Sequence, residues 1–212
     1  MSLGDRMKEN YEDRYRIKLT RRTPVIVRLD GKAFHTLTKN CEKPFDEDFI
    51  NTMFVTGNTL CNQIQGAKCA YIQSDEISLL LTDFDNLSTE AWFDYNLQKI
   101  ISISAGIASS SFTMLWHYFG TKCVTKCSCV FDARAFNVPK EEVCNYFIWR
   151  QKDWIRNSIQ MLARKYFSHN ELHNKKIKDI HDMLYTKNIN WADLEDRWKN
   201  GIHIETITKL GI

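Results

Sequence analysis

Residues 24–30 read Pro-Val-Ile-Val-Arg-Leu-Asp and run directly into Gly31. β-branched and apolar residues dominate this stretch and glycine is a frequent turn residue, so the sequence predicts a strand that ends in a turn. Two further apolar stretches, residues 68–73 (KCAYIQ) and 77–82 (ISLLLT), flank a short polar link at residues 74–76. That pattern predicts a hairpin whose turn contains no glycine. These three strands form the centre of the predicted fold.

Helical periodicity occupies the segments on either side of the hairpin. Residues 46–65 carry apolar side chains at near-helical spacing, and Asp46 is a candidate N-cap. Residues 90–119 predict a second, longer helix, with Ser88 or Thr89 as its candidate cap. One helix therefore precedes the hairpin and one follows it.

The remaining segments complete an α+β arrangement. Residues 127–138 (CSCVFDARAFNV) predict a fourth strand, Pro139 then opens a long helix, and residues 171–185 form a shorter amphipathic helix. The order β-α-β-β-α-β, followed by additional C-terminal helices, is the split βαβ or ferredoxin-like arrangement. RNA-binding modules, acylphosphatases, polymerase palms and nucleotide cyclases all use this fold, so the fold alone does not choose a function.

The composition indicates one globular domain. The chain has 212 residues, 43% of them hydrophobic, and a net charge of only +3, so no overall basic field demands a nucleic-acid partner. The first ten residues are polar, no apolar run reaches transmembrane length, and the cysteines number seven. These features predict a reducing, cytoplasmic setting with free thiols and no membrane association.

Three of the cysteines are close together in the sequence. Cys123, Cys127 and Cys129 suggest a zinc site, but no second pair of ligands has a matching spacing. The alternative, which we favour, is that Cys127 and Cys129 share one face of the fourth strand as small core residues.

Acidic residues stand at the predicted strand ends. Asp30 closes the first strand, and Asp75 and Glu76 occupy the hairpin link. In a split βαβ sheet these strands lie near one another, so the carboxylates could converge at one edge. Two metal ions about 4 Å apart serve phosphoryl and nucleotidyl transfer, and Mg²⁺ prefers carboxylate and carbonyl oxygens. Gly31 lacks a Cβ and would let its carbonyl approach an ion. The alternative is an ordinary turn beside a solvated hairpin tip.

The long helix after Pro139 carries two side-chain stripes. Arg150, Asp153 and Asn157 share one face, and a cation, an anion and an amide together suit nucleotide binding. The alternative is an exposed polar face with an Arg–Asp pair. The other stripe is predicted to face the core: Ile148, Ile155, Ile159 and Leu162.

Taken in order, the motifs resemble those of the tRNA(His) guanylyltransferase superfamily, and more closely its Thg1-like branch, the 3′–5′ polymerases. The similarity covers nearly the whole chain, and the ordered set is specific although no single piece is. The matching segments are residues 28–35 (RLDGKAFH), 43–44 (KP), 71–76 (YIQSDE), 149–153 (WRQKD), 156–160 (RNSIQ), 172–175 (LHNK) and 189–191 (INW).

The resemblance implies a palm-like catalytic core over residues 1–138. It implies that residues 139–212 form a helical extension that completes the active site within one structural domain. It also implies two Mg²⁺ ions, held by the carboxylates of Asp30 and Asp75 and by the backbone carbonyl of Gly31.

Glu76 matches an acidic neighbour of these ligands and is a further candidate catalytic residue. The implied substrates are ATP, GTP or other nucleoside triphosphates. The residues implied to contact the nucleotide are Lys32, Ala33, Phe34, His35, Lys43, Ser74, Lys99, Arg150, Asp153 and Asn157.

The implied chemistry begins with adenylylation of a tRNA 5′-monophosphate by ATP, after which the 3′-hydroxyl of an incoming nucleotide attacks the activated 5′ end. The eukaryotic tRNA(His) enzymes carry His-Ile-Asn-Asn on the long helix, whereas this chain has Ile155, Arg156 and Ser158 at the first, second and last of those places. The Thg1-like branch shares that departure, which favours templated repair of 5′-truncated tRNA.

The implied partners are tRNA and further copies of the chain, because the family forms homotetramers that hold tRNA across subunits. The densest basic segment contains the candidate RNA contacts Arg164, Lys165, His173 and Lys175. A solvated basic face is an equally good interpretation of that segment. Two other functions remain open: a palm-type nucleotide cyclase or dinucleotide synthase, and a non-catalytic RNA-binding module.

Overall fold

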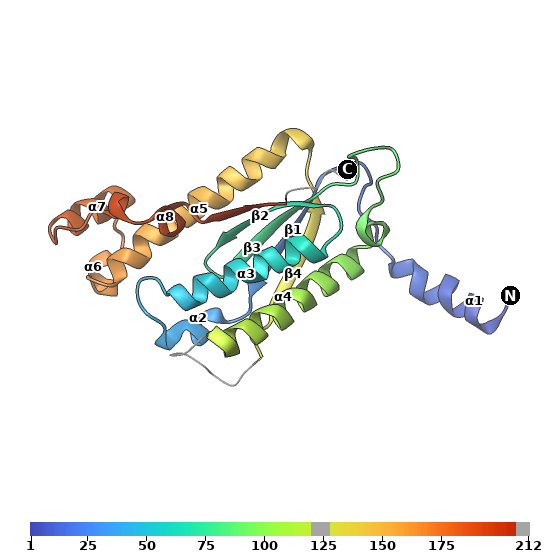
Figure 1. Ribbon diagram of the computed structural model, residues 1–212, viewed down its shortest axis with the longest axis horizontal. Helices are drawn as coiled ribbons and strands as arrows, with labels where there is room; N and C mark the ends of the chain where they lie inside the picture. Colours follow the sequence, from blue (N-terminus) through green and yellow to red (C-terminus); the bar gives the residue numbers. More distant parts are fainter. Residues whose placement is uncertain (120–127, 207–212) are drawn as a thin grey trace.

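The computed structural model describes residues 1–119 and 128–206, which form a sheet with helices on both faces (Figure 1). Its strands follow the order β4-β1-β3-β2-β5, and all neighbours are antiparallel. The order of the first four strands confirms the ferredoxin-like prediction. The strands are β1 (Val25–Gly31), β2 (Ala67–Gln73), β3 (Glu76–Leu81), β4 (Phe131–Asn137) and β5 (Ile202–Glu205).

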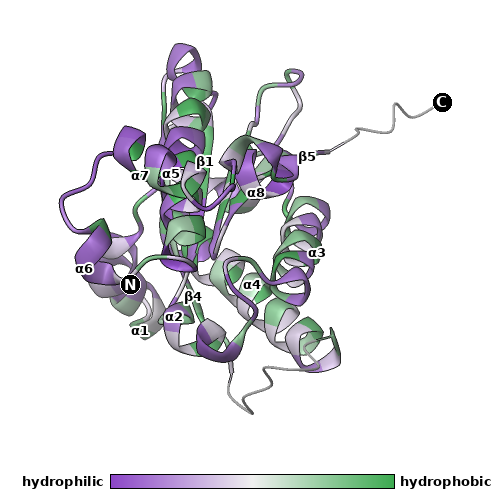
Figure 2. Ribbon diagram, turned by 90° about the vertical axis from the view of Figure 1, so that its left-hand side faces the viewer, coloured by the Kyte–Doolittle hydropathy of each residue, from purple (hydrophilic) through white to green (hydrophobic). Residues whose placement is uncertain are grey.

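Helices α3 and α4 cover one face of the sheet, and α5 lies on the other (Figure 2). Beyond the end of α5, the short helices α6 and α7 extend past the sheet (Figure 1). The helices are α1 (Leu3–Met7), α2 (Phe34–Leu37), α3 (Glu47–Gln63), α4 (Leu97–Phe119), α5 (Val143–Arg164), α6 (His169–Leu172), α7 (Ile177–Tyr185) and α8 (Asp196–Asn200).

The two faces of the sheet differ in chemistry because side chains alternate along each strand. On β1, the side chains of Val25, Val27 and Leu29 belong to the main hydrophobic core and are fully buried. Arg28 and Asp30 occupy the intervening positions and so point to the face that carries α5. The apolar face therefore holds the fold together, while the other face presents charged groups under a helix.

Helix α4 begins later than the sequence predicts, at Leu97 instead of near Ser88. Phe93 and Asp94 have φ values of 52° and 49°, a left-handed conformation that no α-helix can contain. The actual cap is Asn96, whose side-chain oxygen accepts the backbone N–H of Lys99 at 3.1 Å. The cap assignment to Ser88 or Thr89 was wrong, because the predicted helical segment ran across the left-handed residues Phe93 and Asp94, which lie outside α4.

Two other boundaries also differ from prediction. The segment 171–185 is not one helix, because α6 and α7 are separated at Asn174, which has φ 59°. Strand β4 starts at Phe131. Cys123 and Cys127, and with them the question of a zinc site, lie outside the described residues.

The core stripe predicted for α5 is only partly correct. Ile148 is 46% exposed, whereas Arg150 and Trp154 are buried against the rest of the protein. Farther along, Ile159 and Leu162 do enter a hydrophobic cluster, but it is a second, smaller core shared with α7. The first half of α5 therefore turns polar and aromatic side chains toward the charged face of the sheet.

The C-terminal region is not purely helical, because β5 pairs with β2 and extends the sheet. The hydroxyl of Tyr71 on β2 also donates to the carbonyl of Asn200 at 2.8 Å. Residues after α5 therefore belong to the same structural unit as the palm-like sheet. Among the helices of the described residues, none is long and apolar enough to cross a membrane.

Candidate active site

Asp30 and Asp75 meet where β1 ends and the β2–β3 hairpin turns. Asp30 lies opposite Glu76 in the register of β1 and β3, and the backbone N–H of Gly31 donates to the carbonyl of Asp75 at 3.0 Å. Ser74, at φ 48°, supplies the left-handed residue that this tight turn needs without glycine. Backbone pairing thus brings together two acidic residues 45 positions apart in the sequence.

The electrostatics of this pair are unfavourable in the isolated protein. Burial, followed by the negative charge of Asp30, raises the pKa of the Asp75 carboxyl above its ordinary value. Within residues 1–119 and 128–206, neither Asp30 nor Asp75 has an ion pair with a basic side chain. Two adjacent carboxylates without a counter-ion favour a bound cation.

Glu76, one residue along the chain, has the opposite environment. Arg150 donates to both of its carboxylate oxygens, from Nε at 2.7 Å and from Nη2 at 2.9 Å. The Nε atom of Arg28 lies 2.9 Å from the second of these oxygens. Glu76 is only 5% exposed, so two guanidinium groups compensate a buried carboxylate. Because its oxygens are engaged by arginine, Glu76 is suited to positioning α5 on the sheet and not to binding a metal ion.

The donor set suits Mg²⁺ better than a cation with a complete protein cage. No group of three or more His, Cys, Asp or Glu side chains in the described part of the chain is arranged to hold a metal ion. Mg²⁺ commonly binds through one or two carboxylates and completes its shell with water and substrate phosphates. Asp30 and Asp75 fit that requirement.

Gly31 has a packing role beyond the one suggested by the sequence. A Cβ added at Gly31 would lie 2.6 Å from Cγ of Phe34, far inside normal contact. The Phe34 ring is itself held by Phe112 and Phe131, with centroids 5.0 Å away in each case. Phe34 is thus primarily a core residue, and its predicted nucleotide contact could come only from the edge of the pocket that it helps to line.

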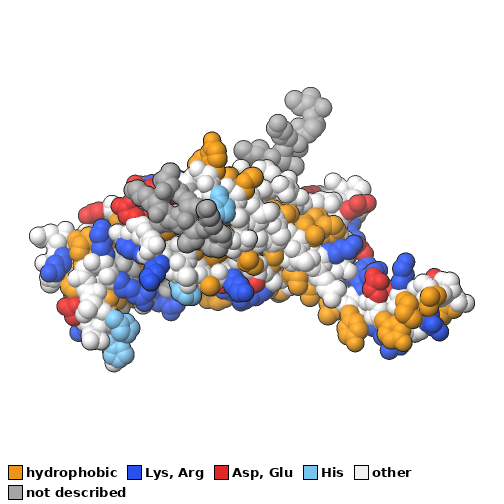
Figure 3. Space-filling model, turned by 90° about the horizontal axis from the view of Figure 1, so that it is seen from below, with side chains coloured by type: hydrophobic (Ala, Val, Ile, Leu, Met, Phe, Trp, Pro, Cys, Tyr) orange, Lys and Arg blue, Asp and Glu red, His pale blue; other side chains and the backbone are white. Residues whose placement is uncertain are grey.

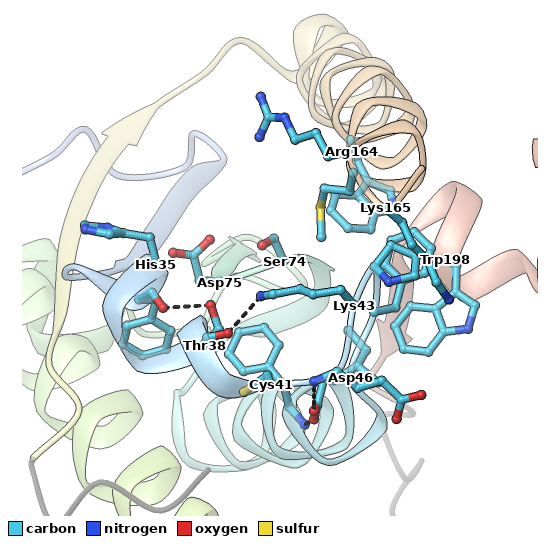
Figure 4. A pocket seen from close by; sticks show the side chains of 18 residues that line it. His35, Thr38, Cys41, Lys43, Asp46, Ser74, Asp75, Arg164, Lys165 and Trp198 are labelled. Atoms are coloured by element: carbon cyan, nitrogen blue, oxygen red, sulfur yellow. Dashed lines mark hydrogen bonds between the residues drawn. The ribbon is translucent and has the colours of Figure 1, made fainter. Parts of the chain in front are cut away.

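Two pockets adjoin the carboxylates. The aromatic pocket, a cavity of about 580 Å³, lies between the α2–α3 segment, the hairpin turn and α5 (Figure 4). The polar pocket, about 390 Å³, lies between the charged face of the sheet and α5. Both are lined by Ser74, Asp75, Trp154, Met161 and Arg164, so the carboxylate centre stands at their junction.

The aromatic pocket combines flat ring surfaces with basic groups. Phe45 and Trp198 stack with centroids 4.8 Å apart and an interplanar angle of 10°. Lys43 extends along the pocket and donates from Nζ to the carbonyl of Thr38 at 2.8 Å (Figure 4). Asp46, predicted as the cap of α3, accepts the backbone N–H of Phe49 at 2.9 Å. This cap holds the start of α3, which forms part of the pocket wall. Rings and cations in one cavity match the base and phosphates of a nucleotide.

Most of the predicted contacts gather at these two pockets. Those that line the aromatic pocket are Phe34, His35, Lys43, Ser74, Asp75, Arg164 and Lys165. Those that line the polar pocket are Asp30, Ser74, Asp75, Glu76, Arg150, Asp153, Asn157 and Arg164. Within the polar pocket, Arg150 and Asp153 are already paired with each other at 3.2 Å. The Arg–Asp pair of the alternative interpretation is therefore present, but Arg150 is buried in the wall of the pocket instead of exposed.

Other predicted contacts lie elsewhere. Lys99 stands in the first turn of α4, with Nζ 5.7 Å from the Phe93 ring. The site lies toward the opposite end of α4, where Thr113 donates to the Cys129 carbonyl just before β4. Since a helix rises 1.5 Å per residue, Lys99 and Thr113 are roughly 21 Å apart. Within one chain, Lys99 lies far from this site and lines neither pocket.

Lys32 and Ala33 are exposed and line neither pocket. Ala33 instead precedes α2 in a left-handed conformation, with φ 57°. His173 and Lys175 are also exposed and outside both pockets, on the segment between α6 and α7.

Sequence reasoning missed several residues of the two pockets. Arg28 lies two positions before Asp30, so strand periodicity already placed it on the same face. Gln73 is the register partner of Glu76 on β2 and could have been found from the hairpin. Trp154 and Trp198 had no signal in the local sequence, because their places depend on how α5 and α8 cross the sheet.

A palm-like sheet with two uncompensated carboxylates beside nucleotide-sized pockets is typical of nucleotidyltransferases. The family model for tRNA(His) guanylyltransferase matches residues 4–139, and the chain belongs to that family. A bacterial tRNA(His) guanylyltransferase (Thg1)-like protein solved in complex with ATP is 49% identical, covering 96% of this chain and 86% of that chain, with a TM-score of 0.89. Another, in complex with GTP, is 46% identical over 97% and 84%, with a TM-score of 0.84.

Among curated proteins, the chain is similar to the probable tRNA(His) guanylyltransferase of Drosophila melanogaster, with 30% identity over 142 residues. The match covers 66% of this chain but 48% of that protein. The chain thus spans about half the length of this relative, and the mouse relative is covered to 45%.

Proposed function

We propose that the chain is a magnesium-dependent nucleotidyltransferase that adds nucleotides to the 5′ end of tRNA in the 3′–5′ direction. Its expected role is templated repair of 5′-truncated tRNA after ATP-dependent activation of the 5′ end. The observation that carries the proposal is the carboxylate pair Asp30 and Asp75, uncompensated at the junction of two pockets. The ATP and GTP complexes of the similar bacterial proteins support nucleotides as substrates.

The metal part of the proposal assigns the carboxylates of Asp30 and Asp75, with the carbonyl of Gly31, as ligands for two Mg²⁺ ions. When bound there, Mg²⁺ would lower the pKa of the attacking hydroxyl and neutralise triphosphate charge. The protein's own contribution is to hold both carboxylates close together in spite of their repulsion. The β1–β3 pairing and the Gly31–Asp75 hydrogen bond do so.

The aromatic pocket is the proposed site for the nucleotide that activates the 5′ end. Its base would lie against the Phe45 and Trp198 rings, and its phosphates would lie toward Lys43, Arg164 and Lys165. A phosphate oxygen of the tRNA 5′-monophosphate attacks the α-phosphorus of ATP. A P–O–P linkage to AMP forms, the bond to the β-phosphate breaks, and pyrophosphate leaves.

Nucleotide addition follows at the same carboxylate centre. The 3′-hydroxyl of the incoming nucleotide attacks the 5′ phosphorus of the activated tRNA and loses its proton to solvent. A phosphodiester bond forms and AMP leaves, or pyrophosphate when the RNA begins with a 5′-triphosphate. The polar pocket adjoins Asp30 and Asp75 on the α5 side and is the proposed site for this nucleotide.

The residues that stand at the positions of the eukaryotic His-Ile-Asn-Asn motif support templated addition. Ser158 is buried, donates to the carbonyl of Trp198 at 2.6 Å and accepts from Nε1 of Trp191 at 3.0 Å. Arg156 is exposed and donates to Asp153 at 2.6 Å. These side chains serve packing and surface pairing, so base pairing with the RNA's 3′ strand is left to select the nucleotide.

The proposed RNA surface runs from the pocket rim to the C-terminal helices. Lysine and arginine side chains gather on the half of the molecule that carries α6 and α7 (Figure 3). Arg164 and Lys165 stand where this surface meets the aromatic pocket, and His173 and Lys175 lie farther out. Basic groups along such a path would contact tRNA phosphates. A cytoplasmic homotetramer completes the proposal.

The test is extension of a 5′-truncated, 5′-labelled tRNA with Mg²⁺ and nucleoside triphosphates. We expect addition to follow the base opposite the missing position, and to change when that base is changed. Addition that ignores the opposing base would contradict templated repair. Nucleotide products formed without any RNA would instead support a cyclase or dinucleotide synthase, and RNA binding without product would support a binding module.

A further inference from the structure

Gln73, in the wall of the polar pocket, carries a buried hydrogen-bond acceptor that is unsatisfied. Its side chain is 4% exposed and lines that pocket, and its Oε1 atom has no hydrogen-bond partner among the described residues. Native proteins leave few buried polar atoms unpaired, and those that remain commonly mark bound water, ligands or functional groups. The position of this acceptor, next to the turn that carries Asp75, makes a ligand contact the natural explanation.

The orientation of the Gln73 amide follows from its neighbour. Its Nε2 atom donates to Oε1 of Glu76 at 3.2 Å. Both carboxylate oxygens of Glu76 already accept hydrogen bonds from Arg150, so the Gln73 amide turns its NH₂ end toward Glu76. The carbonyl end is then directed away from Glu76. Arg150 thus holds Glu76, Glu76 holds the NH₂ end of Gln73, and Oε1 of Gln73 is left unpaired among the described residues.

The position of that oxygen relates it to the reaction centre. Gln73 lies opposite Glu76 across β2 and β3, and Glu76 lies opposite Asp30 across β3 and β1. These three side chains form one cross-strand row on the face covered by α5. Gln73 also immediately precedes the Ser74–Asp75 turn. A hydroxyl group that approaches Asp30 and Asp75 through the polar pocket therefore comes close to Gln73.

We propose that Oε1 of Gln73 accepts a hydrogen bond from the ribose 2′-hydroxyl of the incoming nucleotide and so selects ribonucleotides over deoxyribonucleotides. The inference rests on the proposed function, in which the neighbouring 3′-hydroxyl is the attacking group. A ribose 2′-hydroxyl is an O–H donor adjacent to that attacking oxygen. The base of the nucleotide is a weaker candidate, because the Trp154 ring is the only flat surface among the described residues that line the polar pocket.

The experiment compares each NTP with its 2′-deoxy form as the incoming nucleotide, on a 5′-triphosphorylated truncated tRNA. Both forms retain the 3′-hydroxyl, so the bond made is the same. For the wild type we expect a higher kcat/KM with the ribonucleotide. Gln73→Met should lower that kcat/KM by roughly five- to tenfold, the size expected for one hydrogen bond, and leave the deoxy value nearly unchanged.

Gln160→Met is the matched control, because Gln160 lines the same pocket from α5. Whatever it does to the rate, it should preserve the ribose preference of the wild type. Equal losses with both sugars in Gln73→Met would show that Gln73 only supports the fold, and would overturn the inference. A wild type without ribose preference would overturn it as well, even if the variant does not fold.

Equilibrium binding of NTP and dNTP to the same proteins separates this inference from the proposed function. If the wild type extends no tRNA, the repair function fails, but tighter binding of NTP that Gln73→Met abolishes would still support the Gln73 contact. Equal binding of both sugars by the wild type, together with active but unselective extension, would reject the contact and leave the repair function in place.

Discussion

Arg150 donates to both carboxylate oxygens of Glu76, at 2.7 and 2.9 Å, across 74 residues of sequence. This contact joins the middle of α5 to the first residue of β3 and positions the helix over the charged face of the sheet. It also divides the acidic residues of the hairpin into two kinds. Glu76 is compensated by arginine, whereas Asp75 faces Asp30 without a cation.

Glu76→Gln should destabilise the protein by about 3–5 kcal/mol, because it leaves the buried guanidinium of Arg150 and the partly buried guanidinium of Arg28 without their carboxylate. Urea unfolding followed by circular dichroism measures the change. Glu195→Gln is the matched control, since Glu195 pairs with Arg197 at 2.9 Å but is 65% exposed, and its loss should cost at most about 1 kcal/mol. Similar small effects for both variants would show that the Arg150 contact contributes little to stability.

Asp30→Asn and Asp75→Asn should have the opposite effect on stability. Each removes one of two repelling carboxylates, so without Mg²⁺ the free energy of unfolding should stay the same or rise. Extension of the truncated tRNA should nevertheless fall by more than about a hundredfold, because loss even of outer-shell metal partners commonly costs 10- to 100-fold. Near-normal extension by either variant would remove that residue from the proposed metal site.

The stability contributed by Asp75 should depend on pH in the metal-free protein. Because its folded-state pKa lies above the ordinary value of 3.8, the folded state retains a proton that the unfolded state releases. Ionisation of Asp75 therefore lowers stability as the pH rises above about 3.8 toward the folded-state pKa, and the full penalty is present above both. Below 3.8, the penalty is absent.

The measurement is the free energy of unfolding of wild type and Asp75→Asn between pH 3.5 and 7 in EDTA. The advantage of the variant should grow with pH and shrink when Mg²⁺ replaces EDTA. A difference that does not vary with pH would contradict a raised pKa for Asp75.

Gly31→Ala should destabilise the protein by about 1–3 kcal/mol, the usual cost of forcing an extra methyl group into a packed core. The added Cβ would meet the Phe34 ring at 2.6 Å, and that ring is held by other aromatic residues. Gly106→Ala is the matched control, because nothing lies within 4 Å of its Cβ position on α4. This change should stabilise by about 1 kcal/mol through helix propensity. Thermal unfolding distinguishes the two, and equal melting temperatures would contradict the packing role of Gly31.

Much of the fold follows from periodicity and element order. The β-branched and apolar content of residues 24–30 predicted the strand that ends at Asp30 and Gly31, and the βαββαβ order then set the arrangement of the first four strands. The convergence of Asp30 and Asp75 followed from that arrangement. Local cues were less reliable at breaks in helices, since the left-handed conformation of Phe93 leaves no clear mark in the sequence.

Periodicity shows which side chains share a face, but not what that face will meet. Ile148 was predicted to be buried and is exposed. The side of α5 that faces the sheet there carries Arg150, which binds Glu76, so Ile148 points away from the sheet. Lys99 was a candidate nucleotide contact by resemblance, yet the length of α4 places it far from the carboxylates within one chain. The sequence by itself determined the first four strands, their order and the acidic pair. Only the tertiary structure decided which charges are compensated, since that depends on contacts between residues distant in the chain.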